Sequence, residues 1–210
     1  MIKISNYTKI IKGTTVLKDI NLTFENGRIY GLRGRNGSGK TMLMRAICGL
    51  IIPTEGHIEI DGKILGSNLS FPPSVGVLIE NPAFLDNRTG LQNLKLLAAI
   101  NNKITEDDIK NALIKVGLDP QDKRKFRKYS LGMKQKLGIA AAIMESPELL
   151  ILDEPLNALD ADGVDKVRKI LIDFKSRGAT VIIACHDREE LEMLSDEIVF
   201  IENGEIVHEN

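Results

Sequence analysis

Tryptophan is absent from this sequence, cysteine is scarce, and no apolar run is long. The two cysteines among 210 residues, Cys48 and Cys185, form no CxxC pair, so we expect reduced core thiols rather than a disulfide or a zinc site. The longest apolar run, residues 137–144, is far shorter than the ~20 residues that a membrane helix needs. Residues 1–5 show no signal-peptide core. We therefore expect a cytoplasmic protein that does not itself cross a membrane.

An excess of charge of one sign is also missing. Lys and Arg number 28 and Asp and Glu 29, which gives a formal net charge of -1. Because a general nucleic-acid binder needs a basic field, we expect no nucleic-acid partner. The hydrophobic fraction of 43% and the charged fraction of 27% are ordinary for a globular chain that buries a core. The length predicts a single domain, residues 1–210.

Strand-like segments alternate with helical patterns, which predicts an α/β fold with a largely parallel core sheet. Near the start, Gly13 and the turn signal Asn26-Gly27 divide strands expected at 3–6, 16–20, 22–25 and 28–32. Helical patterns then occur at 91–100, 106–116 and 134–144. We therefore predict a helical subdomain at 81–148, inserted between two parts of an α/β catalytic core at 1–80 and 149–210.

A phosphate-binding motif follows the strand expected at 28–32. Residues 34–41 match G-x-x-x-x-G-K-[ST], the Walker A loop. Glycines let the backbone curl until successive N–H groups point at phosphate oxygens, and the following helix adds its positive end. Lys40 is expected to reach the β and γ phosphates, and the Thr41 hydroxyl to bind Mg²⁺. The predicted nucleotide-binding residues in this segment are Gly34, Arg35, Asn36, Gly37, Ser38, Gly39, Lys40, Thr41 and Met42.

An acidic motif ends the apolar strand expected at 149–152. This segment runs directly into Asp153 and Glu154. The pair fits a Walker B motif, in which Asp153 holds the Mg²⁺ shell and Glu154 polarises the attacking water as general base. Taken alone, the pair of acids is better explained as the acidic start of a helix that follows a core strand. After a Walker A loop, the ATPase interpretation is favoured.

Three further motifs follow in an order that makes the chain resemble the nucleotide-binding subunits of ABC transporters over essentially its whole length. The stretch at 129–135 stands where that family has its LSGGQ signature, Asn157 and Asp160 stand at its D-loop, and His186 stands at its switch histidine. The resemblance implies a P-loop NTPase (RecA-like) core with an N-terminal antiparallel β-subdomain and an inserted α-helical subdomain. A lone histidine is more often structural, and only the neighbouring motifs favour a catalytic His186.

The resemblance also implies a sandwich dimer that hydrolyses ATP. Lys40, Glu154 and His186 are its implied catalytic residues. The signature of one subunit would face the γ-phosphate bound by the other, although Ser130 also fits a plain helix cap. The implied signature contacts are Ser130, Leu131, Gly132 and Met133.

Departures from the common family pattern narrow the subgroup. Glu80 replaces the usual glutamine, and the signature reads Ser-Leu-Gly-Met. Together they look like the exporters for bacitracin resistance and lantibiotic self-immunity, which pair with ABC-2-type permeases. Glu80 would then join Thr41 and Asp153 as Mg²⁺ ligands. The alternative for Glu80 is an exposed acid on a turn.

The residue expected beside the nucleobase is also unusual. Ile11 aligns with the family's adenine-stacking aromatic residue and cannot stack. Met42 stands where a second hydroxyl is usual. We therefore expect a loose preference for ATP, with GTP partly accepted.

The resulting expectation is an ATP-binding subunit on the cytoplasmic face of the membrane. As a homodimer or heterodimer it would drive a separate permease that exports a peptide antibiotic, drug or lipid-like cargo. The basic run at 123–128 is a solvated face or a contact with that permease or with acidic headgroups. The alternative is a soluble ABC ATPase that acts as an assembly scaffold without a permease. A binding module with vestigial hydrolysis is a third possibility, which the intact Lys40 and Glu154 disfavour.

Overall fold

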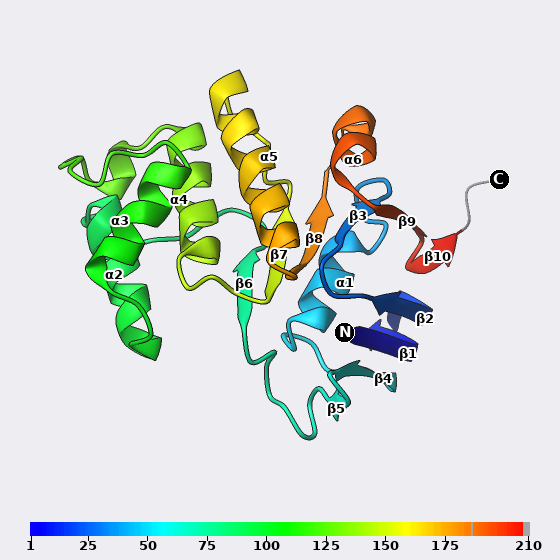
Figure 1. Cartoon of the computed structure of the whole chain (residues 1–210). Helices are drawn as coiled ribbons and strands as arrows, with labels where there is room; N and C mark the ends of the chain where they lie inside the picture. The colour runs from blue at the N-terminus through cyan, green and yellow to red at the C-terminus, as the bar shows by residue number, and fades with distance from the viewer. Residues whose placement is uncertain (186, 208–210) are drawn as a thin grey trace.

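A mixed six-stranded sheet forms the centre of the protein (Figure 1). The computed structural model describes residues 1–185 and 187–207. Five neighbouring strands of the sheet pair in parallel, and the sixth pairs antiparallel with its neighbour at one edge. In spatial order, the strands are β10 (Glu205–Val207), β9 (Glu197–Glu202), β3 (Ile29–Arg33), β8 (Thr180–Ala184), β7 (Leu149–Asp153) and β6 (Val75–Leu78).

The N-terminal segment forms a separate antiparallel sheet. Its order is β2 (Thr14–Phe24), β1 (Ile2–Ile11), β4 (Glu55–Ile60) and β5 (Lys63–Ile64). The two strands expected at 16–20 and 22–25 are one strand. Asp19 bulges inside it at φ 45, where Asn6 and Asn21 each donate a side-chain hydrogen bond to its carboxylate at 3.0 Å. Asp and Asn tolerate this left-handed conformation better than other side chains, so the bulge replaces the expected break.

The central sheet is buried on both faces because its strands alternate their contacts. Along β7, Leu150 and Leu152 pack with the helices α4 (Leu131–Ile143) and α5 (Ala161–Ser176). Leu149 and Ile151 pack instead with the helix α1 (Lys40–Ile47) and the antiparallel sheet. A continuous apolar strand is the pattern that a parallel sheet covered on both sides requires.

A group of helices lies between β6 and β7 in the chain, on the left in Figure 1. It consists of α2 (Gly90–Asn101), α3 (Glu106–Lys115), the short 3-10 helix η1 (Phe126–Lys128) and α4. A capping box of Thr105 and Asp108 begins α3. Helix α4 begins earlier than expected from residue 134, because the Ser130 hydroxyl accepts from the Met133 N–H at 3.2 Å and caps it.

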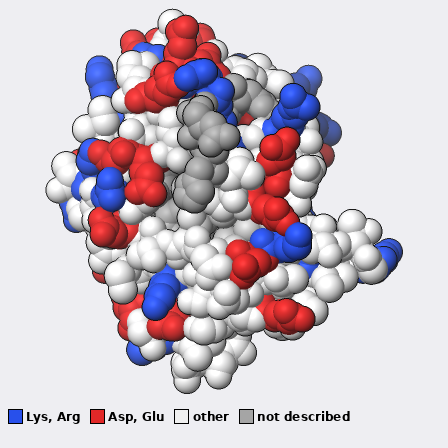
Figure 2. Space-filling view, turned by 90° about the vertical axis from the view of Figure 1, so that its right-hand side faces the viewer, with Lys and Arg blue, Asp and Glu red and all other residues white. Residues whose placement is uncertain are grey.

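The remaining helix, α6 (Arg188–Leu194), connects β8 to β9. No helix among the residues described is long and apolar enough to cross a membrane. On the face shown in Figure 2, the acidic and basic side chains of the described residues are interspersed.

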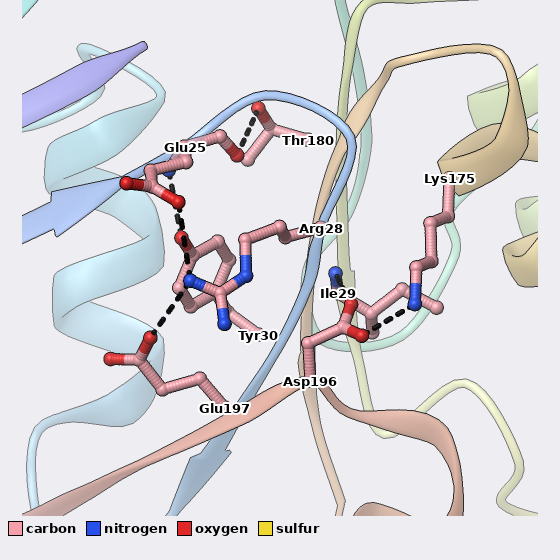
Figure 3. A network of polar contacts seen from close by, with 8 residues as sticks. All are labelled: Glu25, Arg28, Ile29, Tyr30, Lys175, Thr180, Asp196 and Glu197. Atoms are coloured by element: carbon pink, nitrogen blue, oxygen red, sulfur yellow. Dashed lines mark hydrogen bonds and ion pairs between the residues drawn. The ribbon is translucent and has the colours of Figure 1, made fainter.

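Polar contacts fix the start of β3, the strand that leads into the Walker A loop (Figure 3). The Asp196 carboxylate accepts from the Ile29 N–H at 2.9 Å and also binds Lys175. The Tyr30 hydroxyl accepts from the Glu25 N–H at 2.8 Å. Burial opposes ionisation of Asp196, but the Ile29 N–H and the Lys175 ammonium outweigh it and hold the pKa of the Asp196 carboxyl below its ordinary value. The network anchors β3 at the end remote from the loop.

Candidate nucleotide-binding site

The Walker A segment forms the connection between β3 and α1. Gly37 and Gly39 have φ of 79 and 114, in the region that favours glycine. At Gly34 the restriction is steric, since a Cβ there would lie 2.2 Å from the carbonyl oxygen of Ile201. The first turn of α1 contains no acidic residue, so no side chain there opposes an anion at the helix N-terminus.

Lys40 is buried within this loop. Its ammonium donates to the carbonyl oxygens of Gly34 at 2.7 Å and Arg35 at 3.1 Å, and only 6% of the residue is exposed. The Ser38 hydroxyl is also buried and has no hydrogen-bond partner in the described part of the chain. A buried cation and an unsatisfied donor beside a helix N-terminus suit a polyanionic ligand.

Thr41 and Asp153 bring the two phosphate motifs together. The Thr41 hydroxyl donates to the Asp153 carboxylate at 2.7 Å, and Asp153 is 8% exposed. This hydroxyl and carboxylate are hard oxygen donors of the kind that Mg²⁺ prefers, so the donor set fits the ion. No cluster of three or more His, Cys, Asp or Glu side chains suited to a metal occurs within the described residues. Since Mg²⁺ commonly completes its shell with waters and substrate phosphates, two protein ligands are compatible with it.

A pocket of about 480 Å³ lies over these residues. Besides residues of the Walker A and Walker B motifs, it is lined by residues that the motifs did not identify, from the start of β2 and the turn before β10. The lining residues are Thr14, Thr15, Val16, Asn36, Gly37, Ser38, Gly39, Lys40, Thr41, Met42, Asp153, Glu154, Asn203 and Gly204.

Ile11, the residue expected beside the nucleobase, ends β1 and is 37% exposed. It pairs with Thr14 across the hairpin but is not among the lining residues. Gly34 and Arg35 line a second hollow instead, together with Cys185 and Phe200.

Glu80 follows β6 and has a left-handed backbone, with φ 61. The pairing of Leu78 with Leu152 places it at the same sheet edge as Asp153. Its carboxylate nevertheless accepts from the Arg45 guanidinium at 2.7 Å rather than joining Thr41 and Asp153. A role for Glu80 as a metal ligand stays a prediction.

The four signature residues Ser130, Leu131, Gly132 and Met133 begin α4 and do not line the pocket. Leu131 is 65% exposed despite its apolar side chain. Gly132 packs against the D-loop, where an added Cβ would lie 2.6 Å from the carbonyl oxygen of Ala158. The signature therefore lies on the surface and is supported from below by the D-loop.

The D-loop residues have structural bonds of their own. The Asn157 N–H donates to the Glu154 carbonyl at 3.2 Å. Asp160 caps α5 and accepts from Lys136 at 3.0 Å, and this lysine lowers the pKa of the Asp160 carboxyl. His186, the predicted switch histidine, lies outside the described residues.

A strand–loop–helix phosphate cradle beside a strand-end acid defines a P-loop nucleotide-binding protein. Comparisons with known proteins show which family of P-loop proteins this is. The family described as "ABC transporter" matches residues 17–157, which is more than half of the chain. The protein therefore belongs to the ABC transporter ATP-binding family and is an ATPase, as the sequence resemblance predicted.

Named relatives agree with the predicted subgroup. The chain is 50% identical over 206 residues to the uncharacterized ABC transporter ATP-binding protein YybJ of Bacillus subtilis (strain 168), covering 98% of this chain and 94% of that one. It is 42% identical to the bacitracin transport ATP-binding protein BcrA of Enterococcus faecalis, covering 100% and 68%. It is 39% identical to the lantibiotic transport ATP-binding protein SrtF of Streptococcus pyogenes, covering 100% and 90%.

A solved structure described as the ATP binding subunit of an ABC transporter superposes with a TM-score of 0.89 at 25% identity, covering 100% of this chain and 89% of that one. The predicted fold class is thereby confirmed, as is the resemblance to the bacitracin and lantibiotic type.

Proposed function

We propose that this ATP-binding subunit drives a separate ABC-2-type membrane permease that exports a peptide antibiotic, a drug or a lipid-like compound. The bond between Thr41 and Asp153, at 2.7 Å, carries the ATPase half of the proposal because it joins the two phosphate motifs in one pocket. The export half is supported by the relatives described as bacitracin and lantibiotic transport proteins. Location on the cytoplasmic face of the membrane follows from that partner.

In this proposal each residue of the pocket has a separate task. The N–H groups of the loop at 34–41 and the Lys40 ammonium bind the β and γ phosphates. Mg²⁺ would be held by Thr41 and Asp153, and also by Glu80 once its carboxylate leaves Arg45. When bound, the ion neutralises phosphate charge. Glu154 takes the proton of the attacking water. ATP is preferred loosely over GTP, since Ile11 offers no aromatic face.

We further propose that two copies, or this chain and a related one, enclose ATP between them. The exposed Leu131 and the capped start of α4 lie outside the pocket of their own chain, which leaves the signature available for a second subunit. Residues 130–133 would meet the γ-phosphate held by the partner. Asn157 and Asp160 would lie at the same interface. Residues 81–148 would form the helical subdomain, between core parts 1–80 and 149–210.

The test compares wild type with Glu154→Gln in Mg²⁺-dependent ATP hydrolysis, while size exclusion follows dimer formation with ATP. Wild type should turn over, and the variant should lose hydrolysis but dimerise with ATP. Failure of wild type to hydrolyse ATP or to dimerise would contradict the proposal for the isolated chain. Recovery from membranes together with a permease supports a transporter, whereas recovery only away from membranes supports an assembly scaffold.

A further inference from the structure

The backbone at Glu154 has a conformation that a non-glycine residue seldom adopts. Its φ is 50, in the left-handed region. Such a backbone is unfavourable for a residue with a side chain and persists only where the surroundings hold it. The Glu154 N–H donates to the carbonyl oxygen of Ala184 at 2.9 Å, which extends the pairing of β7 with β8. The direction in which the Glu154 side chain leaves the strand therefore depends on what fixes its carbonyl group.

Among the described residues, two donors bond to this carbonyl. One is the Asn157 N–H at 3.2 Å, inside the same turn. The other is the side-chain amide of Gln135, which donates at 2.9 Å from α4, far away in the sequence. Gln135 is 9% exposed on an otherwise apolar helix face. A buried amide in such a place requires a partner, and the bond fixes both groups.

The same helix contacts the turn after β7 at two further points. Gly132 packs against Ala158, and Lys136 binds Asp160. The first two turns of α4 and the segment at 154–160 are thus joined by a close backbone contact, an amide bond and an ion pair. These contacts couple the position of the start of α4 to that of the Glu154 backbone.

We infer that Gln135 is a positioning residue for hydrolysis, which sets the direction of the Glu154 carboxylate and links it to the signature at the start of its own helix. The inference rests on the proposed function, in which Ser130 meets the ATP held by the partner subunit. Five residues of helix, about 7.5 Å, separate Ser130 from Gln135. Contact at the partner's γ-phosphate therefore reaches the general base of this subunit through one turn and a half of helix. Gln135 touches no substrate.

The test is Gln135→Met, which keeps an unbranched side chain of similar length and removes the donor. ATP turnover should fall between about 10-fold and 100-fold, because a small misplacement of the base is costly. The KM for ATP should stay within about 2-fold, since the pocket at 34–41 is untouched. Adding Gln135→Met to Glu154→Gln should cause no further loss of turnover, because both changes act on one group.

A readout that is independent of activity is hydrogen exchange. The amide of Asn157 should lose protection in Gln135→Met, while residues 40–47 keep theirs. The matched control is Asn93→Leu, which removes another buried amide, bonded to Leu85 and Thr89, from the neighbouring helix α2. It should lower the melting temperature without changing turnover at 25 °C.

Unchanged turnover in Gln135→Met beside an active wild type overturns the role of Gln135 and leaves the proposed function intact. Equal loss of turnover in Asn93→Leu also overturns it, because the effect would then be general destabilisation. Wild type without ATP hydrolysis overturns the proposed function first and this inference with it.

Discussion

The guanidinium of Arg45 holds the carboxylate of Glu80 at 2.7 Å. Arg45 lies one helical turn after Thr41 on α1, so it is close to the metal ligands proposed for the site. Under the proposed function, Glu80 would have two competing positions: the ion pair seen here and the shell of a metal beside Thr41 and Asp153. Because both partners are partly exposed, the ion pair stabilises its position by about 1 kcal/mol at most.

Removal of this arginine should make the metal easier to bind. In Arg45→Met, the concentration of Mg²⁺ at half-maximal ATP hydrolysis should fall by about 2- to 5-fold, because the Glu80 carboxylate is released. Glu80→Gln should shift it the other way. Titrating Mg²⁺ at fixed ATP measures both, and an unchanged midpoint in the two variants would remove Glu80 from the proposed ligand set.

Thr41 should be needed for catalysis more than for folding. Thr41→Val keeps the shape of the side chain and deletes the hydroxyl that Asp153 accepts from. Unfolding free energy should change by about 1 kcal/mol, and ATP hydrolysis should fall by at least about 10-fold. Thr54→Val, outside the pocket, deletes a hydroxyl bonded to the Ile10 N–H and should leave hydrolysis unchanged. Similar hydrolysis in the two variants would contradict the role of Thr41.

Two glycine substitutions should separate nucleotide binding from hydrolysis. Gly34→Ala forces a methyl group toward the carbonyl of Ile201, so the loop should lose its shape and bind a fluorescent ATP analogue weakly. Gly132→Ala forces a methyl group toward the carbonyl of Ala158, at the signature. It should bind the analogue normally as a monomer and fail to hydrolyse ATP. Weak binding in both variants would show that the second change also disturbs the loop.

Alkaline pH should destabilise the fold. Burial raises the pKa of the Tyr7 hydroxyl and of the Cys48 thiol to about 12, from 10.0 and 9.0. The folded protein keeps these protons while the unfolded chain releases them, so stability present below pH 9.0 declines as pH rises toward about 12. Urea unfolding at pH 8, 9.5 and 11 measures the decline.

Tyr7→Phe is the control for this effect. It removes the Tyr7 hydroxyl, together with its bond to the carbonyl of Ile51 at 3.1 Å. The variant should be less stable at pH 8 and should lose less stability between pH 9.5 and 11. A slope equal to that of wild type would show that Tyr7 does not contribute.

Local sequence patterns predicted the strand, loop and helix around Lys40 and the buried strand before Asp153, since each depends on neighbours in the chain. They did not predict that β2 is one continuous strand, because the bulge at Asp19 depends on the side-chain amide of Asn6, which lies on another strand.

The other site residues that the sequence did not predict are placed there by partners far away in the chain. Gly204 reaches the pocket because its N–H donates to the carbonyl of Ser38 and its own carbonyl accepts from Lys18, both at 2.8 Å. No sequence motif predicts such a long-range contact. Gln135 ends the stretch that resembles the signature, but its bond to Glu154 could not be predicted, since the partner is a backbone carbonyl rather than a side chain.

The place of β3 in the sheet also bears on how the protein matures. Ile29 pairs with Val181 on one side and Tyr30 with Glu197 on the other, so both neighbours of this early strand come from late in the chain. A ribosome adding about 5–20 residues per second needs several seconds or more to supply them. Pairings of such long range are also slow to form. During synthesis, both edges of the strand that leads into the phosphate loop therefore stay unpaired until β8 and β9 have been made.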